Sequence, residues 1–162
     1  MRKTSERIGE SGAILDEYEK AIAELKDVIT PLSSTDIQQV VDTQTKDKDC
    51  VSIQSILTHV VESGYTYVIE IRKWLGEKID YRKRIYLTTA EEYRNAFDEM
   101  FAFNEQLFVD HPNLKFVECD REKTIIVRWG QNYDVDQLME HAIVHILRHR
   151  RQIENFIPRL KK

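Results

Sequence analysis

Apolar residues recur at intervals of three and four through four long segments of this chain. The repeats cover residues 6–31, 52–76, 89–108 and 134–156. An interval of three or four returns a side chain to the same face of an α-helix, so each segment predicts an amphipathic helix. Gly and Pro number only 5 and 3 among 162 residues, too few for the many turns of an all-β chain. We therefore expect an all-α four-helix bundle that forms a single domain over residues 1–162.

The predicted helix ends carry local signals. Ser52 stands where the second helix begins, and Gly76 is a plausible stop for it. Thr89 opens the third helix and is followed by Glu92 three residues later, the spacing of a capping box. Asp134 is the predicted cap of the fourth helix.

The segments between these helices lack helical periodicity. Residues 42–49 form a polar stretch typical of a loop, and residues 78–87 form a basic linker with aromatic residues. Residues 115–119 and 124–129 are rich in strand-forming residues and flank the polar sequence DREK. We expect them to pair as a short β-hairpin near residues 115–128.

Charge and composition argue against several classes of partner. The net charge is −4, so no overall field attracts nucleic acid or an anionic membrane, although RHRR, RLKK and RKR are basic patches. No run of about 18 apolar residues is present, and no apolar run follows the charged start as in a secretory signal. Cys50 and Cys119 lie far apart and outside any metal-binding spacing, which is typical of reduced thiols. We expect a cytoplasmic protein that binds neither nucleic acid nor membranes.

Three of the five histidines share the predicted fourth helix: His141, His145 and His149. A spacing of four places side chains one turn apart on one face, and two such imidazoles can bind one metal ion at about 2.0–2.1 Å. At about 100° per residue, His149 points within roughly 40° of the centre of the apolar face, and His145 within roughly 80°. His141 is displaced by roughly 120°, towards the flank of the helix. Gln152 lies on the same side as His145 and is placed to donate to a bound group or to fix a ring.

His59, on the predicted second helix, is the candidate for a third ligand. It points roughly 130° away from the aliphatic stripe of its helix, which predicts a groove at the edge of the bundle. A site of three histidines leaves coordination positions open, as in catalytic metal centres. The residues also allow another interpretation, because histidines on an apolar face are often hydrogen-bonded core residues and cations are favoured near a helix C-terminus. His111 lies in a predicted loop and receives no assignment.

These residues together resemble the DinB-like superfamily of four-helix-bundle metal-dependent hydrolases and thiol transferases. That family has a histidine in an L-x-H-apolar setting on the second helix and the pattern H-x-x-x-H-R-x-Q on the fourth. Residues 57–60, LTHV, match the first pattern, and residues 145–152, HILRHRRQ, match the second. The resemblance covers nearly the whole chain in helix number, order and loop lengths. Arg151 departs from it, because the family usually has a small residue there.

The resemblance implies that His59, His145 and His149 bind a divalent ion of the zinc, nickel, iron or manganese class, with water or substrate at the other positions. It also implies a long crossover between the second and third helices, and a homodimer. The imidazole ligands themselves do not select one metal. A shifted pair, His141 with His145, remains open as an alternative.

A metal held in this way suits two kinds of reaction on a small-molecule substrate. It can activate bound water for hydrolysis, or polarise a thiol or carbonyl. Hydrolysis normally needs a neighbouring carboxylate as general base, and Glu62 and Glu140 point elsewhere by helix angle. This favours transfer of a low-molecular-weight thiol, as in the thiol transferases of the family. The alternative is a non-catalytic metal-binding or ligand-sensing bundle.

Aromatic side chains are further candidates for a pocket near the histidines. Their positions are more typical of core or rim residues than of a binding site. The candidates are Tyr65, Tyr67, Trp74, Trp129 and Tyr133.

Overall fold

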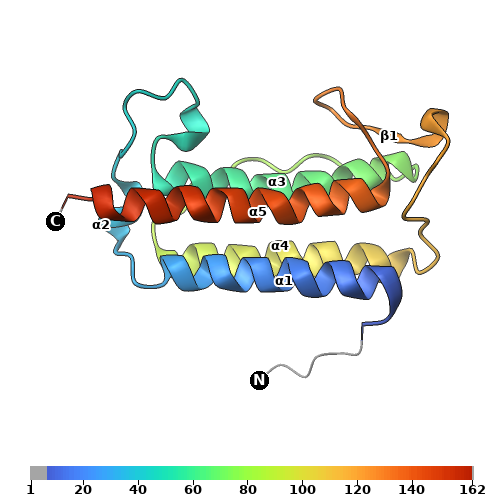
Figure 1. The fold of residues 1–162 in the computed structure, drawn as a ribbon, viewed down its shortest axis with the longest axis horizontal. Coiled ribbons are helices and arrows are strands. Elements are labelled where there is room, and N and C mark those ends of the chain that lie inside the picture. The colour runs from blue at the N-terminus through green and yellow to red at the C-terminus, as the bar shows by residue number, and fades with distance from the viewer. Residues whose placement is uncertain (1–6, 162) are drawn as a thin grey trace.

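The computed structural model describes residues 7–161 of the chain. Four long helices dominate this part: α1 (Gly9–Ile29), α3 (Ile53–Trp74), α4 (Ala90–Asp110) and α5 (Val135–Phe156) (Figure 1). The predicted all-α bundle is confirmed, although Glu6, near the predicted start of the first helix, lies outside the described residues. The shorter elements are helix α2 (Ser34–Gln38), the 3₁₀ turns η1 (Lys48–Cys50), η2 (Arg121–Lys123) and η3 (Ile157–Arg159), and strands β1 (Ile125–Ile126) and β2 (Asn132–Tyr133).

Helices α3, α4 and α5 begin where the sequence predicts. Ser52, Thr89 and Asp134 each accept a hydrogen bond from the backbone N–H three residues later, and the side chain at that position bonds back to the cap. These reciprocal bonds satisfy donors that the start of a helix leaves unpaired. At the end of α3, Gly76 adopts a φ of 90°, which residues with a Cβ rarely adopt, and the chain leaves the helix there.

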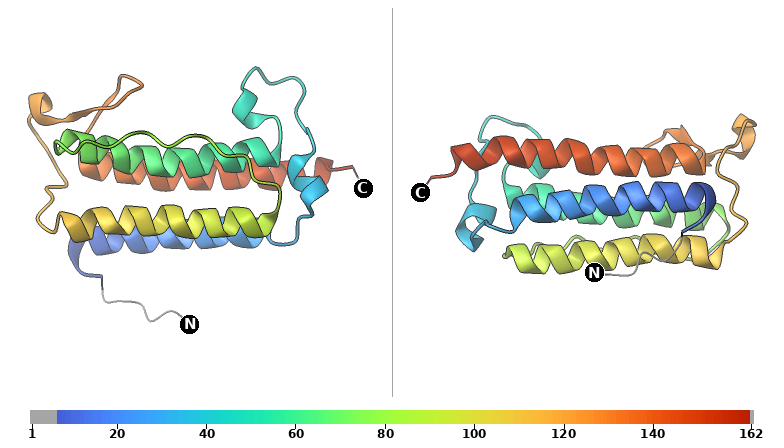
Figure 2. Two further views of the ribbon diagram at one scale, coloured as in Figure 1. Left: turned by 180° about the vertical axis from the view of Figure 1, so that it is seen from behind. Right: turned by 60° about the horizontal axis from the view of Figure 1, so that its bottom comes forward.

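Each long helix packs against two of the others. Helix α1 contacts α4 and α5, and α3 contacts the same two helices from the opposite side of the bundle. Figures 1 and 2 show that α3 and α4 run in one direction, while α1 and α5 run in the other. The chain that leaves α3 must therefore return along the bundle before α4 begins. This is the predicted long crossover.

The crossover, residues 75–89, has almost no regular secondary structure and runs back along α3 (Figure 2). Helix α3 has 22 residues and is therefore about 33 Å long. At about 3.3 Å per residue, an extended chain as long as the crossover can run back along the whole of this helix. The Tyr81 hydroxyl donates to the buried Glu70 of α3 at 2.8 Å, and the Tyr93 hydroxyl of α4 accepts from the backbone of Leu87 at 3.2 Å. One bond lies before Arg84 in the sequence and the other after it, and together they hold the crossover against α3 and α4.

Helices α3 and α4 approach closely at Gly64. A Cβ at this position would lie 2.4 Å from Sδ of Met100, which is fully buried. The Asn104 amide, also fully buried, donates to the backbone carbonyls of Gly64 and Met100. A small residue on α3 and a polar side chain on α4 therefore fix how the two helices sit against each other.

The β-hairpin differs from the prediction. Ile125 and Ile126 pair with Tyr133 and Asn132, whereas residues 115–119 form no strand. The reason is a tight turn that ends at Gly130, which has a φ of 88° and donates to the carbonyl of Val127. Residues 115–119 instead lie against the start of α5, where the Phe116 carbonyl accepts from the backbone of Asp136 at 3.1 Å.

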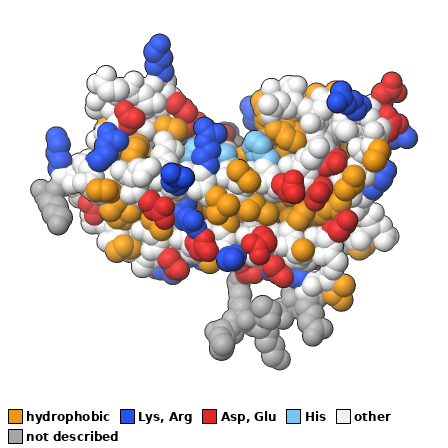
Figure 3. Space-filling model, in the orientation of Figure 1, with side chains coloured by type: hydrophobic (Ala, Val, Ile, Leu, Met, Phe, Trp, Pro, Cys, Tyr) orange, Lys and Arg blue, Asp and Glu red, His pale blue; other side chains and the backbone are white. Residues whose placement is uncertain are grey.

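The loop over residues 39–52 and the hairpin region both project from the same side of the bundle, above α3 and α5 (Figure 1). Between these two projections the surface is hollowed, and histidine side chains are visible at its bottom (Figure 3). Within residues 7–161, no helix combines the length and apolar character needed to cross a membrane.

Candidate metal centre

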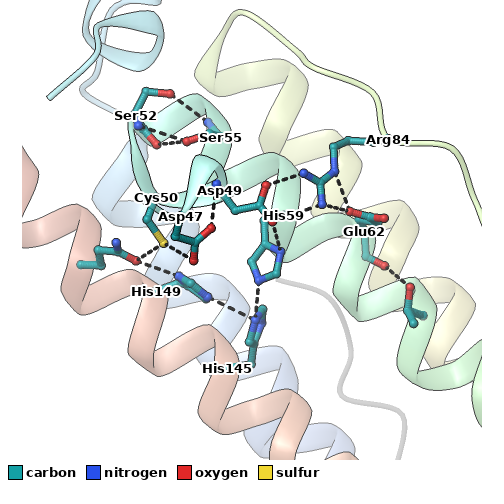
Figure 4. Close-up of polar contacts among 12 residues, drawn as sticks. Asp47, Asp49, Cys50, Ser52, Ser55, His59, Glu62, Arg84, His145 and His149 are labelled. Atoms are coloured by element: carbon teal, nitrogen blue, oxygen red, sulfur yellow. Dashed lines mark hydrogen bonds and ion pairs between the residues drawn. The ribbon is translucent and has the colours of Figure 1, made fainter. Parts of the chain in front are cut away.

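Three imidazole rings from two helices converge at the bottom of this hollow. His145 and His149 lie one turn apart on α5, and His59 reaches them from α3 (Figure 4). Nε2 of His145 lies 2.9 Å from Nε2 of His59 and 3.2 Å from Nε2 of His149. One ring nitrogen from each residue lies within 4.8 Å of the others, so the three could hold one metal ion.

The distances from His145 to its two neighbours suit a shared ion. Two nitrogens that each bind a metal at about 2.0–2.1 Å stand about 2.9 Å apart for a ligand–metal–ligand angle of 90° and about 3.3 Å apart for a tetrahedral angle. The distances of 2.9 and 3.2 Å from His145 to its two neighbours fall in this range. The geometry therefore needs little rearrangement around His145 to accept an ion.

The hydrogen-bond partners of the Nδ1 atoms determine which nitrogen of the His59 and His149 rings carries the lone pair. Nδ1 of His149 lies 2.9 Å from Oε1 of Gln152, and Nδ1 of His59 lies 3.2 Å from a carboxylate oxygen of Asp49. An acceptor at Nδ1 favours the tautomer with its proton there and leaves a lone pair on Nε2.

His59 and His149 consequently both aim an Nε2 lone pair at His145. A neutral His145 can carry at most one proton at Nε2 and so can satisfy only one of them. At least one of these ring nitrogens is then left without a donor from the other two rings. A cation between the three rings would satisfy all of them, so the residues fit a metal ion.

The surroundings keep the three rings neutral, the form that binds metals. Burial lowers the pKa of His145 to about 2, with further lowering by the neighbouring His149 and His59. Burial also lowers the pKa of His59 and His149, while Asp49 and Gln152 respectively act in the opposite direction. Protons therefore compete little with a metal at these nitrogens near neutral pH.

The loop before α3 supplies residues that the sequence interpretation missed. Residues 42–49 were expected to form a polar loop without a role, yet the Asp47 side chain accepts from the backbone of Asp49 at 2.9 Å and so shapes η1. This turn directs Asp49 at His59. Cys50 follows, and its thiol lies 3.7 Å from Oε1 of Gln152 and 3.4 Å from Asp47. The signal in the sequence was a pair of aspartates, Asp47 and Asp49, within five residues before the cap of a helix that carries a histidine.

Glu62 is also closer to the histidines than expected. The helix angle was taken to point it elsewhere, but a spacing of three places it on the same face of α3 as His59. Both residues line one open cavity of about 320 Å³. Arg84, from the crossover, donates to Glu62 at 2.7 Å and also pairs with Asp49. The interpretation that Glu62 points away from the histidines is therefore wrong.

His141 stands apart from the converging nitrogens. Its ring is stacked on that of His145 with centroids 6.3 Å apart, and its Nδ1 lies 3.4 Å from the Tyr133 hydroxyl. It lines the wall of the cavity together with Tyr67 and Trp129. The shifted pair of His141 with His145 is not formed in this arrangement, because the nitrogens that gather are those of His59, His145 and His149.

The aromatic candidates divide between several locations. Tyr67 is buried and Trp129 is partly exposed, as expected for core and rim residues, and both also line the cavity beside the histidines. Tyr65 lines a separate cavity under the crossover. Trp74 lies at the end of α3 and lines neither of these cavities.

In comparisons with known proteins, no protein-family model and no curated protein matches this chain.

Proposed function

We propose that this chain is a metal-dependent enzyme that acts on a small molecule in the cavity beside His59, His145 and His149. The observation that supports this proposal is the convergence of three neutral imidazole nitrogens with more lone pairs than protons. The cavity of about 320 Å³ that opens next to them has room for a small substrate. The reaction class follows the resemblance to the DinB-like superfamily of hydrolases and thiol transferases.

A divalent ion at three neutral ligands keeps its full charge and open positions, and supplies Lewis-acid activation of a thiol, carbonyl or water. The chain's own residues orient the site. Asp49 and Gln152 hold two of the rings, and the stacked ring of His141 borders a third. Tyr67 and Trp129 form an aromatic wall that limits the access of water from one side.

Because carboxylates do line the cavity, their absence no longer favours thiol transfer over hydrolysis. The way in which they are paired favours it instead. Both carboxylates of the cavity are engaged by Arg84, which pairs with Asp49 and Glu62. The guanidinium of Arg84 therefore competes with an attacking water for these carboxylate oxygens. A bound divalent ion would lower the pKa of a thiol substrate, whose proton could then pass to solvent without a general base in the cavity.

The metal is tested by elemental analysis of the purified protein. We expect close to one divalent ion per chain in the wild type, and its loss in His59→Ala, His145→Ala and His149→Ala. His141→Ala is the matched control, because it removes an imidazole from the same cavity without removing a converging nitrogen. Retention of the metal in the first three variants, or its loss in the control, would contradict the proposed ligand set.

The reaction is tested with glutathione or cysteamine and a chromogenic electrophile, with ester hydrolysis measured in parallel. We expect thiol-dependent conjugation that disappears in His145→Ala and returns on adding metal to stripped wild-type protein. Bound metal without turnover in either assay would favour the ligand-sensing bundle instead. The homodimer implied by the resemblance is proposed as well and is measured by sedimentation velocity.

A further inference from the structure

Of the charged side chains that line the cavity beside the histidines, some are paired with one another and one is not. Four line it: Asp49, Glu62, Arg84 and Arg128. Arg84 pairs with both carboxylates, so these three side chains form one closed cluster. Arg128 takes no part in it, and within residues 7–161 no ion pair joins its guanidinium to a carboxylate.

Arg128 is held in place although it has no acidic partner. Its guanidinium carbon lies 4.4 Å from the centre of the Tyr81 ring, a cation–π contact. Its backbone N–H donates to Oε1 of Glu70 at 3.1 Å, the same oxygen that accepts from the Tyr81 hydroxyl. The buried Glu70 thus joins the hairpin and the crossover, and fixes the base of Arg128 at the edge of the cavity. A stacked arginine keeps its planar set of N–H donors free for a ligand.

The charge of the cavity favours an anion at this point. Two carboxylates and two guanidinium groups sum to zero, and a bound divalent ion would bring the total to about +2. The carboxylates are tied to Arg84, so they are not directed at Arg128. A ligand with one negative group would meet a guanidinium to which no carboxylate of residues 7–161 is paired.

We propose that Arg128 binds an anionic group of the substrate, a carboxylate in the simplest case, while the reacting end lies at the three histidines. This inference rests on the proposed function in that the substrate occupies this cavity. It adds that the substrate belongs to the class of small organic anions. Arg128 is then a specificity residue and does not take part in the chemical step.

The test compares two probes that differ in charge alone: 3-mercaptopropionate and 3-mercaptopropionamide. Binding to the wild-type protein is measured by isothermal titration calorimetry. We expect the carboxylate to bind about tenfold more tightly than the amide, the lower end for a charge-assisted hydrogen bond at an exposed arginine. In Arg128→Gln most of this preference should be lost, while the metal content stays at the wild-type level.

Arg121→Gln is the matched control, since it removes an exposed arginine of the same region that does not line the cavity. It should leave the preference for the carboxylate unchanged. A preference that is undiminished in Arg128→Gln, or that is missing in the wild type, overturns the proposal.

A second set of titrations distinguishes binding of the carboxylate by Arg128 from its attraction to the metal ion. The same titrations are made on protein stripped with a chelator, where affinity is lower but Arg128 is still present. We expect the carboxylate preference to persist there and to depend on Arg128. If the purified protein holds no metal, the proposed function fails, yet these titrations still test Arg128. A preference that exists only with metal and ignores Arg128 would attribute it to the ion and overturn the proposal.

Discussion

The substitution Asp49→Asn tests whether the turn before α3 is part of the metal centre. Asp49 lies 3.2 Å from Nδ1 of His59 and is directed there by the side chain of Asp47. A carboxylate at this position raises the basicity of the ligand and holds its ring in orientation. An asparagine has nearly the same shape but no charge, and so the substitution removes the electrostatic part of the contact alone.

The structure sets the size of the effect. Loss of a partner behind a metal-binding histidine typically lowers metal affinity by about 10- to 100-fold. The side chains of His59 and Asp49 are 26% and 25% exposed, and Arg84 already shares the carboxylate, so solvent and the arginine both weaken the contact. We therefore expect the lower end, a loss of about tenfold, which corresponds to about 1.4 kcal/mol.

The assay is a zinc titration in competition with a chromophoric chelator, with circular dichroism to verify the helical fold. Glu62→Gln is the control, because Glu62 lines the same cavity and pairs with the same Arg84. It removes the same amount of charge without touching a ring nitrogen of His59. Affinity unchanged by Asp49→Asn would refute the argument. An equal loss in Glu62→Gln would also refute it, because the effect would then come from general charge.

Two further predictions concern stability. Asp134→Ala should lower the free energy of unfolding by about 1–2 kcal/mol in urea denaturation, because it removes the cap of α5, whereas Asp136→Ala in the same turn should cost only a few tenths. The hydrogen bond from the His111 ring holds the pKa of Glu77 below its usual 4.5. The stability that Glu77 contributes is therefore complete above about pH 5 and is lost as the pH falls through 4.5 and below. Urea denaturation should show Glu77→Gln less stable than wild type at pH 6, and the difference should shrink as the pH falls below 4.5. The exposed Glu17→Gln is the control, and a difference independent of pH would contradict this.

The local part of the architecture follows from short-range patterns. The caps Ser52, Thr89 and Asp134 act through hydrogen bonds within four residues, and this is why the sequence located the starts of three helices. The short range of these signals also explains why the hairpin was predicted with the wrong pairing. The hairpin forms at a turn that ends at Gly130. Residues 115–119 lie against the start of α5 instead of pairing with residues 124–129 as predicted.

The candidate site was predictable where one helix supplies two residues. A spacing of four on α5 fixes the relation of His145 to His149 whatever the rest of the chain does. A spacing of three on α3 likewise relates Glu62 to His59, although the sequence interpretation pointed Glu62 elsewhere. Arg84 was not predictable, because the crossover has no periodicity from which the direction of a side chain can be read.

The sequence by itself determined the four helices, the starting residues of three of them and the histidine pair of α5, since all of these depend on backbone geometry within one or two turns. Only the tertiary structure decided that His59 stands level with that pair and that Asp49 closes the outer side of the site. The offset between two helices depends on how their surfaces pack, here including the close approach at Gly64, and on the path of the crossover. These are sums over many weak contacts between distant residues, and no short segment of the chain contains them.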